Sequence, residues 1–178
     1  MTDAPSAWVQ RHTALVPVGG PVLDVAAGGG RHARWFLERA HPVVAVDRDL
    51  SALRRALGHE PQLETVEVDL EGGSPFPLAG RRFAGVVVVN YLHRPLLPAL
   101  VAAVEPGGAL LYETFLVGQE ALGRPRNPEF LLRPGELLEA VAGELEVVAF
   151  EEGPSDGAVK QRLAAVRPHD HHKMVRTD

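Results

Sequence analysis

The amino-acid sequence predicts an α/β protein with a doubly wound, mostly parallel sheet. Apolar runs suited to strands alternate with segments of helical spacing along most of the 178 residues. Alternation of this kind places helices on both faces of a parallel sheet. The last two strand-like segments follow each other directly across a glycine-containing loop, so they predict a hairpin. We therefore expect seven strands, the last of them antiparallel.

The first half of the chain predicts an amphipathic helix over residues 5–16, which the proline and glycine residues of Pro17–Pro21 end. Three strands follow, and each carries an acidic residue at or near its end: Val22–Ala26, Pro42–Asp47 and Leu63–Asp69. A helix is expected after each of the first two strands, over Arg31–Ala40 and Leu50–Leu57. Glycines and prolines in Gly72–Gly80 predict a loop where a third helix would otherwise stand.

The second half predicts the other four strands. Phe83–Asn90 contains four consecutive valines, a β-branched run suited to burial on both faces of a sheet. The remaining strands are expected over Ala109–Phe115, Leu145–Glu151 and Val159–Val166. Helices are expected over Arg94–Glu105 and Pro134–Ala142. Pro106–Gly108 predicts a tight turn, and Gly153–Gly157 predicts the loop of the terminal hairpin.

The composition is that of an ordinary globular domain, with 46% hydrophobic and 23% charged residues. We expect one domain over residues 1–166, in which residues 1–20 form an N-terminal helix and linker, followed by a polar tail over residues 167–178. The chain has no cysteine, which excludes disulfides and thiolate metal sites.

Charge and hydropathy bear on the partners. No apolar run approaches the roughly 20 residues of a membrane-spanning helix. The net charge of −5 gives no general attraction to nucleic acid. We expect a cytoplasmic protein without a membrane partner, without a strong nucleic-acid signal and without a metal site, and an oligomer stays open.

The most informative segment is the glycine-rich turn after the first predicted strand. Gly28 and Gly30 let the backbone approach a ligand where a side chain would block it. Gly28–Ala33 fits the dinucleotide pattern G-x-G-x-x-A, whereas Asp24–Gly30 reads D-x-A-x-G-x-G. The glycines alone therefore fit two cofactors, and a turn without a ligand is a third interpretation.

The pattern D-x-A-x-G-x-G resembles motif I of the class I S-adenosylmethionine-dependent methyltransferases, which is usually (D/E)-x-G-x-G-x-G. Ala26 stands at the first glycine of that motif, and the replacement asks for an unstrained backbone there. The resemblance covers residues 20–115 with motifs and extends more loosely to residue 166. Within the family, the chain is similar to small bacterial members related to tellurite-resistance methyltransferases. This resemblance implies a Rossmann-like sheet whose antiparallel seventh strand inserts beside the fifth.

Acidic residues at the strand ends indicate how an adenosine-type cofactor would bind. A carboxylate at Asp47 can accept hydrogen bonds from both ribose hydroxyls of NAD or of S-adenosylmethionine, and Arg48 beside it is placed in the same site. The resemblance implies that Asp69 receives the adenine amino group and that Leu70 contacts the purine. Asp24 favours S-adenosylmethionine, because a carboxylate there would stabilise its cationic methionine end and would repel a pyrophosphate.

The segment after the fourth predicted strand completes the expected site. The resemblance implies that the backbone of Asn90 and Tyr91 lies near the methionine moiety and that His93 faces the acceptor. A general base is needed only where the acceptor must lose a proton, and the candidates are His93, Glu113 and Tyr112. The arginines and the one phenylalanine of residues 118–133 would either fold over an acidic small acceptor or form a solvated loop.

We therefore expect S-adenosylmethionine-dependent methyl transfer to a small-molecule acceptor, with S-adenosylhomocysteine as the product. Two alternatives remain open. One is a nicotinamide-dependent reductase, although the chain has no Tyr-x-x-x-Lys segment. The other is a non-catalytic module of the same fold that binds an adenosine ligand or serves in assembly.

Overall fold

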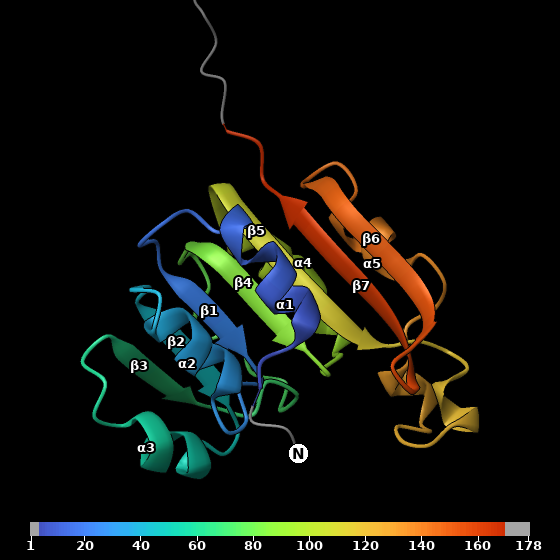
Figure 1. Ribbon diagram of the computed structural model, residues 1–178, viewed down its shortest axis with the longest axis horizontal. Coiled ribbons are helices and arrows are strands. Elements are labelled where there is room, and N and C mark those ends of the chain that lie inside the picture. The colour runs from blue at the N-terminus through green and yellow to red at the C-terminus, as the bar shows by residue number, and fades with distance from the viewer. Residues whose placement is uncertain (1–3, 170–178) are drawn as a thin grey trace, which may run out of the picture.

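A computed structural model describes residues 4–169. Its seven-stranded sheet has the order β3-β2-β1-β4-β5-β7-β6 (Figure 1). The strands are β1 (Val22–Val25), β2 (Val43–Asp47), β3 (Leu63–Glu67), β4 (Phe83–Val89), β5 (Val104–Phe115), β6 (Glu146–Ser155) and β7 (Ala158–Val166). Strands β1 to β5 pair in parallel, while β7 is antiparallel to both β5 and β6. The predicted α/β sheet with its inserted antiparallel last strand is confirmed. Most of the expected polar tail, residues 170–178, lies outside the described residues.

Helices cover both faces of this sheet (Figure 1). They are α1 (Ala7–His12), α2 (Arg31–Leu37), α3 (Ser51–Leu57), α4 (Leu97–Ala102) and α5 (Glu136–Val141). One apolar layer takes side chains from α1, α2 and α3, and the other takes them from α4 and α5. Leu110 and Leu111 of β5 are both buried, one in each layer, because side chains of a strand alternate between its faces. Among the described residues, no helix is long and apolar enough to cross a membrane.

Two predicted turns differ from the structure. Pro106–Gly108 is not a tight turn but part of β5. Gly107 donates a backbone hydrogen bond to the carbonyl of Arg167, and Arg167 donates one to the carbonyl of Gly108, at 2.8 and 2.9 Å. These bonds pair the segment with the chain just after β7, while Gly107 has a φ of +79° and the register with β4 shifts between Phe83 and Gly85. The hairpin loop is also shorter than expected, because β6 runs to Ser155.

The predicted helix over Arg94–Glu105 is also shorter. It begins as a 3-10 turn over Arg94–Leu96 and ends as an α-helix at Ala102, beyond which β5 begins. Pro95 and Pro98 lie in its first turns, where a missing backbone N–H costs little.

The order of the strands reverses between β1 and β4, which lie at the centre of the sheet. β2 and β3 lie to one side of β1, and β5 lies on the far side of β4. In a doubly wound sheet, the loops at the carboxyl ends of such neighbouring strands diverge and leave a crevice. The ligand site of this protein is therefore expected beyond Val25 and Val89.

Candidate functional site

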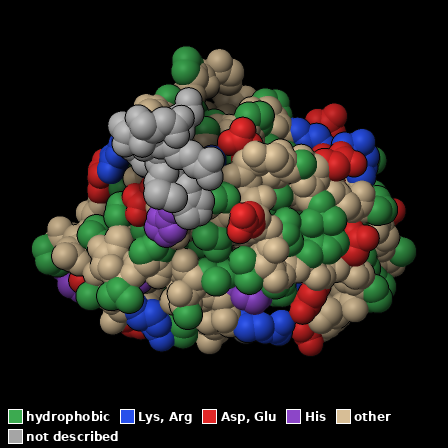
Figure 2. Space-filling model, turned by 90° about the horizontal axis from the view of Figure 1, so that it is seen from above, with side chains coloured by type: hydrophobic (Ala, Val, Ile, Leu, Met, Phe, Trp, Pro, Cys, Tyr) green, Lys and Arg blue, Asp and Glu red, His purple; other side chains and the backbone are tan. Residues whose placement is uncertain are grey.

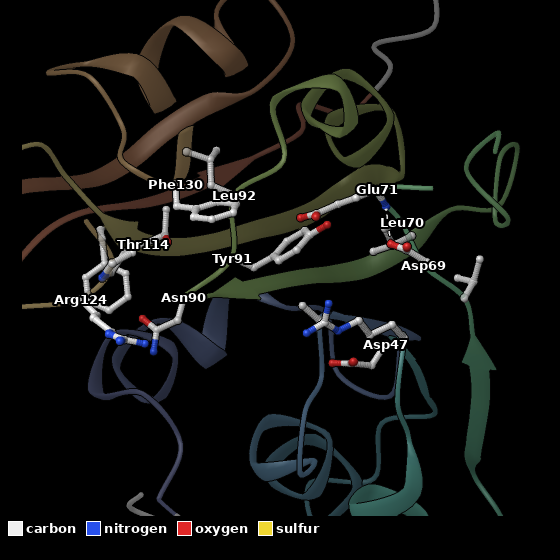
Figure 3. A pocket seen from close by; sticks show the side chains of 15 residues that line it. Asp47, Asp69, Leu70, Glu71, Asn90, Tyr91, Leu92, Thr114, Arg124 and Phe130 are labelled. Carbon is white, nitrogen blue, oxygen red and sulfur yellow. Dashed lines mark hydrogen bonds between the residues drawn. The ribbon is translucent and has the colours of Figure 1, made fainter. Parts of the chain in front are cut away.

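A cavity of about 690 Å³ opens at the carboxyl ends of the parallel strands (Figure 3). Its walls come from the segments after β1, β2, β3 and β4 and from the end of β5. Seven of the predicted site residues line it: Ala26, Asp47, Arg48, Asp69, Leu70, Asn90 and Tyr91. The fold therefore brings together residues that lie far apart in the sequence, as the strand-end argument predicted.

Asp47 connects the end of β2 to the glycine-rich turn. Its Oδ2 accepts a hydrogen bond from the backbone N–H of Gly28 at 2.8 Å, and its Oδ1 accepts one from the N–H of Asp49 at 3.1 Å. A carboxylate oxygen can accept more than one hydrogen bond, so these contacts leave acceptor capacity toward the cavity. The carboxylate thus both orders the turn and faces the ligand site.

The two motif glycines have different roles in the structure. Gly28 has a φ of +55°, and a Cβ built on it would meet nothing within 4 Å. Gly30 has a φ of +85°, and a Cβ there would lie 3.0 Å from side-chain atoms of Leu53 and Leu57 in α3. Neither glycine is among the residues that line the cavity. Gly30 is therefore explained by close packing of the turn against α3, and the predicted ligand contacts of Gly28 and Gly30 stay predictions.

The expectation of an unstrained backbone at Ala26 is wrong. Ala26 has a φ of +54°, in the left-handed region that costs an L-residue about 1–2 kcal/mol. The chain leaves β1 here, and the N–H of Ala27 donates to the carbonyl of Val46 at 3.0 Å. That bond to β2 fixes the path of the backbone, and Ala26 has to follow it along the cavity wall.

Asp24 is buried beneath the cavity and is not part of its lining. Its Oδ2 accepts a hydrogen bond from the N–H of Ala33 at 3.0 Å, which attaches the first turn of α2 to β1. Burial raises the pKa of this carboxyl to about 7, because it disfavours the charged form. The structure thus gives Asp24 a role in holding α2, and its contact with the methionine end of a cofactor stays a prediction.

The segment after β3 supplies the acidic end of the cavity. Asp69, Leu70 and Glu71 lie together there, and Tyr91 extends toward Glu71 (Figure 3). Burial, followed by the charges of Glu71 and Asp69, raises the pKa of Tyr91 to about 12. The Tyr91 hydroxyl therefore keeps its proton at neutral pH. Sequence reasoning missed Glu71 as a lining residue, although it follows Asp69-Leu70 directly.

The three predicted general bases, His93, Tyr112 and Glu113, lie outside the cavity lining. Tyr112 is buried, and its hydroxyl donates a hydrogen bond to the carbonyl of Tyr91 at 2.8 Å. Glu113 is buried, and its Oε2 accepts a hydrogen bond from Nε of Arg162 at 2.9 Å, while Nζ of Lys160 lies 4.0 Å from its Oε1. Two cations thus hold this carboxylate away from the cavity, and we propose no catalytic role for it. His93 is partly buried at the start of the turn after β4, and its role stays a prediction.

Lys160 also holds a residue of the cavity wall. Its Nζ donates a hydrogen bond to Oδ1 of Asn90 at 2.8 Å. Asn90 has a φ of +57°, a conformation that asparagine tolerates better than most residues do. Lys160 belongs to β7, so the inserted last strand stabilises the turn after β4. The local sequence around Asn90 gave no signal for this partner.

The comparisons with known proteins agree with this geometry. A family model described as a methyltransferase domain matches residues 22–108, which span the glycine-rich turn, Asp47, Asp69 and Asn90. The glycopeptide N-methyltransferase MtfA is 26% identical over 90% of this chain and 89% of its own, with a TM-score of 0.62. A TehB-like S-adenosylmethionine-dependent methyltransferase from Corynebacterium glutamicum is 20% identical over 90% of this chain and 86% of its own, with a TM-score of 0.65.

A third similar structure is the 1,6-didemethyltoxoflavin-N1-methyltransferase of Burkholderia thailandensis. It is 20% identical over 91% of this chain and 79% of its own, with a TM-score of 0.66. At 20% identity, it and the C. glutamicum protein show a shared fold. The family model adds a sequence match over the motifs that form the cavity. Residues 22–108 thus match a methyltransferase domain in sequence, and the fold of the described chain is that of the class I S-adenosylmethionine-dependent methyltransferases.

Proposed function

We propose that the cavity binds S-adenosylmethionine and opens toward a small-molecule acceptor that receives the methyl group. The observation that supports this most strongly is the position of Asp47, which lines the cavity while it holds the glycine-rich turn. The cavity volume of about 690 Å³ lies within the range typical of small-molecule sites. The chemistry of the donor set fits the cofactor, because carboxylates and apolar side chains alternate along the wall.

Each part of the wall suits one part of the cofactor. Asp47 would accept hydrogen bonds from the ribose hydroxyls, and Asp69 would accept one from the adenine amino group. Leu70 is partly buried against the apolar core and offers a hydrophobic surface to the purine. The backbone of Asn90 and Tyr91 would lie beside the methionine moiety. The excess of carboxylates over cations at this end favours a cationic ligand over a pyrophosphate.

The cofactor would supply a methyl group bonded to a positively charged sulfur. The sulfur would keep the electron pair of the broken bond, so the leaving group needs no proton. The main contribution of the protein is therefore to align the acceptor and to exclude water. Tyr91 remains a neutral hydrogen-bond donor. An acceptor atom that is already nucleophilic needs no base, which is consistent with a wall that places neither Glu113 nor His93 at the cavity.

A small acceptor is supported by the size and cover of the site. The far wall comes from the end of β5 and from residues 124–130, a short segment that leaves a single cavity for both cofactor and acceptor. Similar structures are a methyltransferase of glycopeptides and one of 1,6-didemethyltoxoflavin. We propose a small molecule for this chain too.

Calorimetric titration with S-adenosylhomocysteine tests the assignment of the cavity. We expect Asp47→Ala to weaken binding by about 1–3 kcal/mol, roughly 5- to 150-fold, because hydrogen bonds to a charged acceptor are lost. Asp49→Ala is the matched control, since Asp49 is exposed, lies outside the cavity lining and caps the N–H of Ser51. An equal loss of affinity in both variants would remove Asp47 from the site.

A further inference from the structure

The acidic side chains of the cavity gather at one of its two ends (Figure 3). Asp69 and Glu71 lie at the end assigned to the cofactor, with Asp47 and Arg48 nearby, so carboxylates outnumber cations there. Arg124 lies at the opposite end, beside Asn90 and Thr114. Within residues 4–169, the guanidinium of Arg124 makes neither an ion pair nor a hydrogen bond. Its charge is thus available to an anionic group in the cavity.

The backbone that carries Arg124 is fixed by a buried side chain. Gln119 donates a hydrogen bond from Nε2 to the carbonyl of Arg124 at 3.0 Å, and its Oε1 accepts one from the N–H of Val159 at 2.8 Å. Gln119 is only 6% exposed. It ties the loop to the start of β7, so the backbone position of Arg124 is set by a buried side chain of the protein. Ordering of this kind lowers the entropy cost of ligand binding.

The aromatic ring of Phe130 lies at the same end of the cavity, and its backbone too is held by hydrogen bonds from another side chain (Figure 3). Arg94 donates to the carbonyls on both sides of it, from Nη1 to Glu129 at 2.9 Å and from Nη2 to Leu131 at 2.8 Å. Arg94 is itself held by Glu136, whose carboxylate is buried and accepts from its Nε at 2.6 Å. Phe130 nevertheless stays 43% exposed, although an aromatic ring usually packs against apolar neighbours.

We infer that the acceptor is a planar, ring-containing molecule with an anionic group, whose charge pairs with Arg124 and whose ring packs against Phe130. This inference rests on the proposed function, because it assigns the end of the cavity that the cofactor leaves free. A guanidinium binds a carboxylate through two parallel hydrogen bonds, and Phe115 and Tyr91 add further aromatic surface to the wall.

Three probes of matched size test the inference on protein saturated with S-adenosylhomocysteine. Benzoate carries both the ring and the charge, benzamide has the same ring without the charge, and cyclohexanecarboxylate has the charge without a planar ring. We expect benzoate to bind about 10-fold more tightly than benzamide, since hydrogen bonds to a charged group are replaced by neutral ones. Cyclohexanecarboxylate should also bind more weakly than benzoate. Ligand-observed NMR titration measures such affinities into the millimolar range.

Two arginine variants separate a specific contact from general charge. Arg124→Gln should reduce the affinity for benzoate about 10-fold and leave that for benzamide unchanged. Arg126→Gln is the matched control, because Arg126 is exposed on the same loop and is not part of the cavity lining. Phe130→Ala should weaken both aromatic probes. Equal affinities for benzoate and benzamide, or an equal effect of the two arginine variants, would overturn the inference.

The affinity for S-adenosylhomocysteine is measured first on the wild type and on each variant. Wild-type protein that fails to bind S-adenosylhomocysteine would contradict the proposed function, whatever the probes do. Binding of S-adenosylhomocysteine without a preference for benzoate would contradict the acceptor assignment alone.

Discussion

The backbone of Ala26 lies in the left-handed region at the end of β1, where glycine would be free of strain. Replacement by glycine removes a conformational cost of about 1–2 kcal/mol and adds unfolded-state entropy of about 0.4–1 kcal/mol. We expect Ala26→Gly to raise the free energy of unfolding by up to about 1 kcal/mol in urea titrations. Ala27→Gly is the control and should lower it, because Ala27 is buried. A loss of stability in Ala26→Gly as large as that in Ala27→Gly would show that the strain is not real.

The buried carboxyl of Asp24 makes stability depend on pH. Its pKa in the folded protein is about 7, above the ordinary value of 3.8, so the folded state holds this proton more tightly than the unfolded state does. The stabilising contribution is therefore complete below pH 3.8 and is lost as the pH rises toward 7.

Asp24→Asn removes the titrating carboxyl and with it this pH dependence of stability. The amide oxygen of the new side chain can still accept the hydrogen bond from the N–H of Ala33. We expect the variant to gain stability relative to the wild type between pH 5 and pH 8, by a few kcal/mol at most. Urea unfolding of both proteins at the two pH values measures the difference. A difference that stays the same at both would mean that Asp24 keeps an ordinary pKa.

At the scale of elements, the N-terminal segment is attached to the first turn of α2. The N–H of Ser6 donates to Nε2 of His32 at 3.1 Å, and Arg31 donates to the carbonyl of Ala4 at 3.3 Å. Burial lowers the pKa of His32 to about 4, which keeps the ring neutral and able to accept this bond. Trp8 attaches the same segment to β7, because its Nε1 donates a hydrogen bond to the carbonyl of Leu163 at 3.1 Å.

This attachment should weaken in acid. The folded pKa of His32 lies below the ordinary 6.5, so its stabilising contribution is complete above pH 6.5 and is lost as the pH falls toward 4. We expect the amides of α1 to lose protection from hydrogen exchange over this window, after correction for intrinsic rates. His32→Leu should remove most of the pH dependence, and His59→Leu, at an exposed histidine, should leave it intact. The same loss of protection in His32→Leu would assign it to another group.

Some element boundaries follow from local composition, whereas others depend on contacts with distant parts of the chain. The valines of β4 predicted a buried central strand, because that pattern depends only on local composition. Pro106–Gly108 was predicted to be a turn but belongs to β5, because hydrogen bonds to Arg167, far along the chain, hold it there. The strain at Ala26 likewise follows from a bond between the neighbouring strands. Contacts between distant segments therefore determine those backbone conformations that local sequence patterns do not predict.

The same limit applies to the site in the whole molecule. The positions of Asp47 and Asp69 were predictable, because carboxyl ends of parallel strands meet at one edge of a sheet, and that of Asn90 was implied by the family resemblance. The ion pairs of Glu113 were not predictable, because its partners lie on β7. The register between β5 and β7 cannot be deduced from the sequence of either strand alone. Figure 2 shows one face of the molecule: on its described part, acidic and basic side chains are interspersed without a broad basic area.

The proposed activity of the whole molecule depends on which cofactor the cavity accepts. Calorimetric titration of the wild-type chain with S-adenosylhomocysteine and, separately, with NADH tests this most directly. Because carboxylates dominate the cofactor end, we predict one binding site per chain for S-adenosylhomocysteine and no detectable binding of NADH. Binding of NADH without binding of S-adenosylhomocysteine would contradict the account.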